Sequence, residues 1–98
     1  MNEENEVQKL IDEINFRKSN VKNYETMTIN ELSVELREIM NFEVKSLEKI
    51  DTFEKKHHNS DLGKYAKMIC KNTMQREIAQ VQETYLKKFD EYLNSKKS

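Results

Sequence analysis

The sequence predicts an all-α protein: an elongated three-helix bundle, in which two long helices form an antiparallel hairpin and a shorter N-terminal helix packs beside them. Its 98 residues include no Pro and a single Gly, and 36% are Asp, Glu, Lys or Arg, which is typical of long helices. Apolar residues recur every three or four positions, the period of amphipathic helices with coiled-coil-like packing. We expect one helical domain over residues 1–98, with helices at about 3–23, 29–58 and 60–94.

The first helix is predicted to be the weakest of the three. Three glutamates near its beginning favour a helix start, because acidic groups stabilise the positive end of the helix dipole. Its apolar residues then follow a 3-4 spacing, except that Arg17 occupies a position where the heptad calls for an apolar side chain. Asn15 and Asn20 are poor helix formers. We place the connector to the next helix at residues 23–27.

The central helix has a clear start signal. Thr28 and Glu31 fit a capping box, in which each side chain accepts a hydrogen bond from the backbone amide of the other residue. The apolar positions that follow cover an arc of roughly 200°, about twice the stripe that a helix with one neighbour shows. So broad a face needs at least two packing partners. At about 1.5 Å per residue the helix is roughly 45 Å long.

The last segment is joined to the central helix by a very short link, which implies an antiparallel hairpin. Pairing about this turn is expected to bring Phe53 near Tyr65 and Leu32 near Leu86. The apolar face of the last segment changes midway. Either the helix breaks near Asn72, giving four helices, or it continues and is buried on different sides by different partners. Because neither Pro nor Gly occurs at the change, a continuous helix is favoured.

Charge and cysteine content narrow the possible functions. The net charge of −1 gives no bulk attraction to nucleic acid or anionic membranes. Cys70 is the only cysteine, which favours a reducing compartment and excludes an intramolecular disulfide. No apolar run reaches the ~20 residues of a membrane span, and the acidic beginning of the chain is no secretory signal. We expect a cytoplasmic protein without membrane contact; export without a cleavable signal is the alternative.

No arrangement of residues predicts catalysis, a cofactor or a metal. His57 and His58 are adjacent and point about 100° apart on a helix, so they do not hold one ion as an i,i+4 pair does. Lys67 and Lys71 lie near Cys70 in sequence, and a nearby lysine can activate a thiol. No histidine stands at helical spacing to serve as its base, so a buried, unreactive cysteine is the favoured interpretation. We therefore predict a protein that is not an enzyme.

Two charged strips are candidate contact surfaces. The acidic strip comprises Glu31, Glu35 and Glu38. The basic face comprises Lys64, Lys67 and Lys71. The acidic strip is either a solvated surface or a docking site for a basic partner. The basic face supports an alternative function, a dimeric regulator associated with nucleic acid, although the segment lacks an arginine-rich reading surface and nucleic acid is the less favoured partner.

The favoured function is a non-catalytic protein–protein interaction module. We expect a small regulatory, inhibitory or assembly protein that presents a helix face to another protein. An elongated hairpin leaves apolar surface that the first helix is too short to cover, and a homodimer is the natural way to close it. Aromatic side chains typically anchor such interfaces. The candidate interface residues are Phe16, Val34, Phe42, Tyr85, Phe89 and Tyr92.

In outline, a helical hairpin of this length is similar to the Trp-x-Gly family of small helical secretion substrates and their helical partners. The turn here, from His57 to Gly63, lacks the Trp-x-Gly motif, and the chain contains no Trp. Small helical bacteriocin-immunity proteins share the size and the charge-rich helices. These likenesses of outline imply an immunity protein or a secretion partner as further alternatives within the same functional class.

Overall fold

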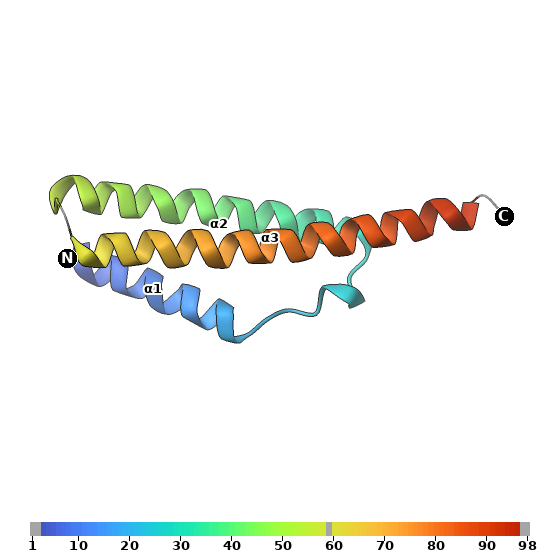
Figure 1. The fold of residues 1–98 in the computed structure, drawn as a ribbon, viewed down its shortest axis with the longest axis horizontal. Helices are drawn as coiled ribbons and strands as arrows, with labels where there is room; N and C mark the ends of the chain where they lie inside the picture. The colour runs from blue at the N-terminus through green and yellow to red at the C-terminus, as the bar shows by residue number, and fades with distance from the viewer. Residues whose placement is uncertain (1–2, 59, 97–98) are drawn as a thin grey trace.

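The computed structural model describes residues 3–58 and 60–96. Three helices follow one another, α1 (Glu3–Ser19), α2 (Ile29–Lys56) and α3 (Asp61–Lys96), with a short 3-10 helix η1 (Tyr24–Thr26) between α1 and α2. The two long helices form an antiparallel hairpin, and α1 lies against the half of the hairpin nearest its turn (Figure 1). The molecule measures 60 × 22 × 19 Å. The predicted all-α, elongated three-helix bundle is confirmed.

Helix α1 buries one stripe at the predicted 3-4 spacing. The buried residues are Val7, Leu10, Ile11 and Ile14. The helix ends at Ser19, four residues before the expected bound, because Asn20 closes it: its side-chain amide donates to the carbonyl of Phe16 over 2.8 Å. Such local side-chain bonds compete with helix continuation. The connector is therefore longer than predicted, and it runs along the hairpin to the start of α2 (Figure 1).

The connector is fixed to the bundle at η1. The Asn23 side chain accepts a hydrogen bond from the amide of Glu25 and so caps η1. This cap presents the ring of Tyr24 to the core, where it is only 6% exposed. Met27 follows and packs against the same core. The connector thus covers the part of the hairpin that α1 does not reach.

Helix α2 begins with the predicted capping box. The amide of Glu31 donates to the Thr28 hydroxyl over 3.1 Å, and the amide of Thr28 donates to the Glu31 carboxylate over 3.0 Å. The helix ends at Lys56, and the ring of His57 stacks on that of Phe53 with 4.6 Å between centroids. Its innermost residues, Leu32, Ile39 and Ile50, are fully buried, in agreement with the broad apolar face.

Helix α3 continues without a break through Asn72 to Lys96, as the sequence favoured. Its first turn is capped by Ser60, whose hydroxyl accepts from the amide of Gly63 over 3.3 Å. One stripe is buried along most of its length, and much of that stripe consists of small residues. Its buried positions are Gly63, Ala66, Cys70, Thr73, Met74, Val81 and Thr84.

Two residues that were expected to pack across the hairpin, Tyr65 and Leu86, are exposed. Gly63 faces Phe53 instead: a Cβ on Gly63 would lie 3.5 Å from the Phe53 ring. The physical reason is the stripe of small side chains, which lets the two backbones approach closely and turns the larger side chains of α3 outward. This also accounts for the apparent change of buried face along α3.

Candidate binding surfaces

The last turns of α3 carry an apolar stripe that nothing in the described chain covers. Figure 1 shows this end of α3 running on past the start of α2. Leu86, Phe89, Tyr92 and Leu93 lie on one side of the helix, since they are spaced by three or four residues, and each is between 40% and 65% exposed. Half-buried Tyr85 continues the stripe toward the bundle. We call these five residues the α3 stripe.

The α3 stripe is ordered by contacts within the helix. The rings of Tyr85 and Phe89 are parallel with centroids 6.2 Å apart, and those of Phe89 and Tyr92 are 6.3 Å apart. The ammonium group of Lys96 lies 4.8 Å from the centre of the Tyr92 ring. Such ring pairs restrict the rotamers of large side chains before any partner arrives, which lowers the entropic cost of binding.

Lys88 fixes where the free end of α3 begins. Its ammonium group donates to the carbonyl of Glu25 over 2.6 Å and also to the carbonyl of Met27. These two bonds attach α3 to the connector just before α2 starts. Adjacent residues on a helix point about 100° apart, so Lys88 faces the connector while Phe89 faces solvent. The lysine therefore holds the α3 stripe at the edge of the bundle.

The structure separates the six predicted interface residues. Tyr85, Phe89 and Tyr92 come together in the α3 stripe. Phe16 projects from the end of α1 and Val34 from α2, and both are exposed on other parts of the surface. Phe42 is half-buried: it packs on the core, and the guanidinium of Arg17 lies 4.5 Å from the centre of its ring. The same reasoning missed Leu86 and Leu93, which belong to the stripe and have its spacing.

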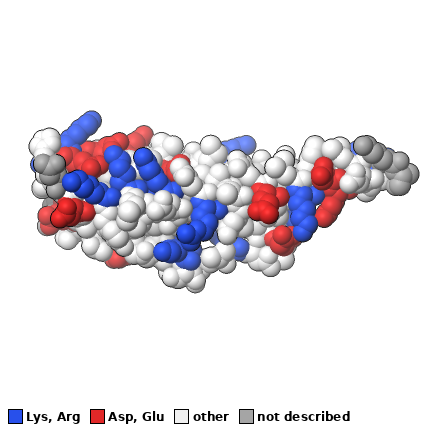
Figure 2. Space-filling model, viewed as in Figure 1, with Lys and Arg blue, Asp and Glu red and all other residues white. Residues whose placement is uncertain are grey.

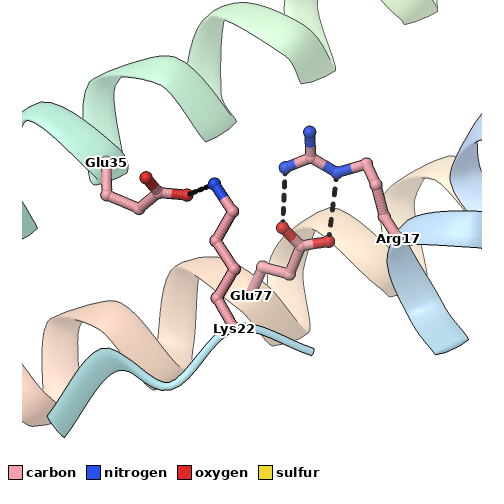
Figure 3. Close-up of polar contacts among 4 residues, drawn as sticks. All are labelled: Arg17, Lys22, Glu35 and Glu77. Atoms are coloured by element: carbon pink, nitrogen blue, oxygen red, sulfur yellow. Dashed lines mark hydrogen bonds and ion pairs between the residues drawn. The ribbon is translucent and has the colours of Figure 1, made fainter. Parts of the chain in front are cut away.

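Two ion pairs join the end of α1 and the connector to the hairpin (Figure 3). The Arg17 guanidinium donates to both oxygens of Glu77 on α3, over 2.7 and 3.3 Å. Lys22 in the connector donates to Glu35 on α2 over 2.8 Å. The charged side chain of Arg17 is accommodated at an apolar heptad position because it reaches a carboxylate on a different helix. A guanidinium–carboxylate pair with two hydrogen bonds is geometrically specific.

Tyr24 lies near both ion pairs, close enough for the charges of Glu77, Glu35 and Arg17 to act on its phenol. Burial raises the pKa of its phenol above the ordinary value, and the negative charges of Glu77 and Glu35 raise it further. Burial alone would lower the pKa of Arg17, but the hydrogen bonds and charge of Glu77 outweigh burial and raise it. At neutral pH the cluster thus contains a neutral phenol and charged Arg17. These groups hold the connector in place; none faces another reactive group in a way that suggests chemistry.

The acidic strip is divided in the structure. Glu35 is only 8% exposed, because the connector folds over the start of α2 and places Lys22 on its carboxylate. Glu31 belongs to the capping box, where the hydrogen bond that the Thr28 backbone amide donates to its carboxylate lowers the pKa of the carboxyl group. Glu38 remains exposed and lines a shallow depression with Val34. Glu35 therefore does not lie on a solvated strip as expected, and a basic partner would meet little more than Glu38.

The basic face is interrupted by carboxylates from α2. Lys67 lies 3.3 Å from a carboxylate oxygen of Glu54 and 3.5 Å from one of Asp51, so much of its charge is compensated. Lys64 and Lys71 are exposed. A phosphate backbone needs several uncompensated cations in register. This arrangement offers two, which gives the nucleic-acid alternative little support.

Cys70 and the histidines show no reactive geometry. Cys70 is fully buried; burial and the nearby charge of Glu43 raise the pKa of its thiol, against the opposing effects of a hydrogen bond with Ser46 and of Lys71. His57 lies 3.6 Å from a carboxylate oxygen of Glu3 at the end of the bundle. No group of three or more potential metal ligands occurs within residues 3–58 and 60–96.

Comparisons with known proteins give this chain no relatives. No protein-family model, no curated protein and no solved structure matches it. Over the part of the chain that the structure describes, no helix has both the length and the apolar character needed to cross a bilayer.

Proposed function

We propose that this protein is a non-catalytic, cytoplasmic interaction module that acts through the α3 stripe. The observation that carries the proposal is the exposure of four large apolar side chains, Leu86, Phe89, Tyr92 and Leu93, on one face of a projecting helix end. Exposed apolar side chains scattered singly are ordinary, but a contiguous patch marks an interaction site. The α3 stripe also contains aromatic residues, and aromatic side chains often anchor protein interfaces.

The first partner in this proposal is a second copy of the chain. Because the stripe lies where α3 projects beyond α2, two copies can bring their stripes together while the two bundles point away from each other. The exposed parts of the four side chains amount to about 400 Å² per copy, taking ~200 Å² for each whole side chain. A stable interface buries about 800 Å² per partner. We therefore expect a weak homodimer whose population rises with concentration.

A weak homodimer suits a regulatory role. A surface that pairs with itself at high concentration is available to another protein at low concentration, so self-association and partner binding compete. An inhibitor, an immunity protein, a secretion partner or an assembly factor can each act by presenting a helix face. We assign the α3 stripe as this face.

Light scattering coupled to size exclusion tests the proposal with matched variants. For the unaltered chain we expect a mass that rises with concentration from 11.8 kDa toward twice that value. Phe89→Glu places a charge in the stripe and should keep the protein monomeric at every concentration. Lys87→Glu alters the charge of the neighbouring exposed residue and should behave as the unaltered chain does. Retention of the dimer in Phe89→Glu would contradict the proposal, provided far-UV circular dichroism shows that the variant is folded.

A further inference from the structure

A second surface lies in the middle of the molecule, where the end of α1 and the connector meet α3. There the structure has a cavity of about 320 Å³. Its walls come from the end of α1, the connector, the start of η1 and the middle of α3. The lining residues include Phe16, Val21, Tyr24, Thr73, Arg76 and Gln80. This volume is at the lower end of the ~300–1,000 Å³ of typical ligand sites. It is large enough for one bulky apolar side chain.

Two large apolar side chains, Phe16 and Val21, stand among the charged and polar residues at the edge of this cavity. Phe16 and Val21 both line it and are each 67% exposed, more than any other large apolar side chain in residues 3–58 and 60–96. Neither contributes to the buried core. Apolar side chains that stand beside a cavity and away from the core are typical of an interaction site.

The cavity is also positively charged. Four cations line it, Arg17, Lys18, Lys22 and Arg76, against the carboxylates of Glu13 and Glu77. Figure 2 shows blue side chains gathered over the end of α1 and the beginning of the connector. The charges of Arg17 and Lys22 are taken up by their ion pairs. In the described chain, Lys18 and Arg76 have no such partner, and Glu13 is a lining carboxylate to which no cation is bound. Counting Glu35, which binds Lys22, four cations face three carboxylates, so the cavity keeps one positive charge in excess while the whole chain has a net charge of −1.

The connector offers backbone donors beside the cavity. Residues 21–23 are exposed and have no regular secondary structure. The amides of Val21 and Lys22 donate to no acceptor within the described residues. The carbonyl oxygens of an extended peptide can accept hydrogen bonds from such amides. A small molecule would use the cavity alone, whereas a peptide uses the cavity, the exposed side chains of Phe16 and Val21 and the free amides together.

The walls of the site are already fixed without a ligand. The two bonds between Arg17 and Glu77 hold the end of α1 on α3, and the bond between Lys22 and Glu35 holds the connector on α2 (Figure 3). Buried Tyr24 also lines the cavity. A binding site that exists before the ligand arrives avoids the entropic cost of forming it.

We infer that this cavity binds an extended acidic peptide segment of a partner protein, with one bulky apolar side chain entering between Phe16 and Val21 and carboxylates meeting Lys18 and Arg76. The charge selects this occupant. A second copy would bring the same cations to the cavity, and like charges facing each other oppose association. The inference does not depend on the α3 stripe, which lies at the end of the molecule.

A random peptide library displayed on phage tests the inference without assuming a sequence. The library is selected on the intact chain and counter-selected on the Phe16→Ser/Arg76→Glu variant, whose substitutions are both at exposed side chains and should leave the fold intact by circular dichroism. We expect enriched peptides in which Phe, Leu or Trp is flanked by Asp or Glu. Binding of a synthetic, fluorescein-labelled copy should weaken about tenfold or more in Phe16→Ser and in Arg76→Glu, and should weaken as salt is raised.

The matched control for this experiment is Phe89→Glu in the α3 stripe, which should bind the labelled peptide as the unaltered chain does. Absence of enrichment over the counter-selected variant would overturn the inference, as would enrichment of basic peptides. Peptides that bind Phe16→Ser normally but fail on Phe89→Glu would also overturn it, while supporting the α3 stripe as a protein-binding surface. The two proposals therefore fail separately.

Discussion

Removing Arg17 tests whether the ion pair with Glu77 fixes α1 to the hairpin. The side chains of Arg17 and Glu77 retain 27% and 15% of their accessible surface, so the pair is neither a surface pair nor a fully buried one. Exposed pairs contribute ~0.2–1 kcal/mol, whereas removing one partner of a buried pair costs ~3–5 kcal/mol. For Arg17→Met we expect a loss of about 2 kcal/mol, because Glu77 is left half-buried without its cation.

That loss is measurable by thermal and urea unfolding followed by circular dichroism. For a domain of this size, about 2 kcal/mol corresponds to a decrease in Tm of roughly 8 to 16 °C. Arg17→Met/Glu77→Leu replaces the whole pair with apolar side chains and should recover to within ~1 kcal/mol of the original stability, because no unpaired charge remains. The matched control is Lys87→Met, which breaks the exposed, 3.8 Å pair with Glu25 and should change stability by less than about 0.5 kcal/mol.

Two results would refute this reasoning. If Arg17→Met were as mild as Lys87→Met, the pair would contribute no more than a surface contact. The two single variants and the double variant form a double-mutant cycle. If the double variant lost as much stability as Arg17→Met and Glu77→Leu combined, the two side chains would not interact, since interacting residues give non-additive changes in stability.

Three further predictions concern titration and the thiol. Stability measured by urea unfolding should fall as pH rises above 9.0, the ordinary pKa of a thiol. Burial raises the folded-state pKa of Cys70 and of Tyr24, so the unfolded chain loses these protons first. Cys70→Ala should remove the part of the decrease that begins at the lower pH. Stability should also fall as pH decreases below about 4.5. The hydrogen bond from Thr28 lowers the folded-state pKa of Glu31, and its stabilising effect is lost when the carboxylate is protonated. Glu31→Gln should flatten this pH dependence while keeping an acceptor for the Thr28 amide. Finally, Cys70 should react with a thiol reagent only as fast as the bundle opens, so a reaction complete within the mixing time for native protein would contradict its burial.

The sequence predicted those parts of the fold that depend on local signals. The capping box at Thr28 and Glu31 is a pattern of four consecutive residues, and its geometry is nearly independent of the rest of the chain. The antiparallel hairpin was predicted from the short link between two long segments whose apolar residues recur at helical spacing. The continuity of α3 followed from the absence of any residue that breaks a helix near Asn72.

The register of the hairpin could not be found in this way, because core positions were assigned to large apolar residues. The structure buries Gly63, Ala66 and Cys70 along α3 and exposes Tyr65 and Leu86 instead. The spacing of small residues by three and four along α3 would have predicted this register, since two helices pack closely where small side chains face the partner helix.

The central cavity was also beyond sequence reasoning. Arg17 and Glu77 are 60 positions apart, and their contact depends on the path of the whole connector. Phe16 was identified only as an apolar residue off the core stripe. Its role beside a cavity becomes visible once the connector places Val21 and Lys22 next to α3.

The most direct test of the α3 stripe as an interface is an intermolecular distance between two copies. Asn94→Cys, labelled with a nitroxide, places a spin probe at an exposed position of α3 at the end of the stripe. The unaltered chain, treated with the same reagent, shows how much label the buried Cys70 takes up. If two stripes pair, the labelled backbones come within about 20 Å of each other, given a rise of ~1.5 Å per residue and ~10 Å between helix axes. Pulsed electron resonance at high protein concentration should then show one short, resolved distance that Phe89→Glu abolishes. A signal without any resolved distance, or one that persists in Phe89→Glu, would contradict the assignment of this surface.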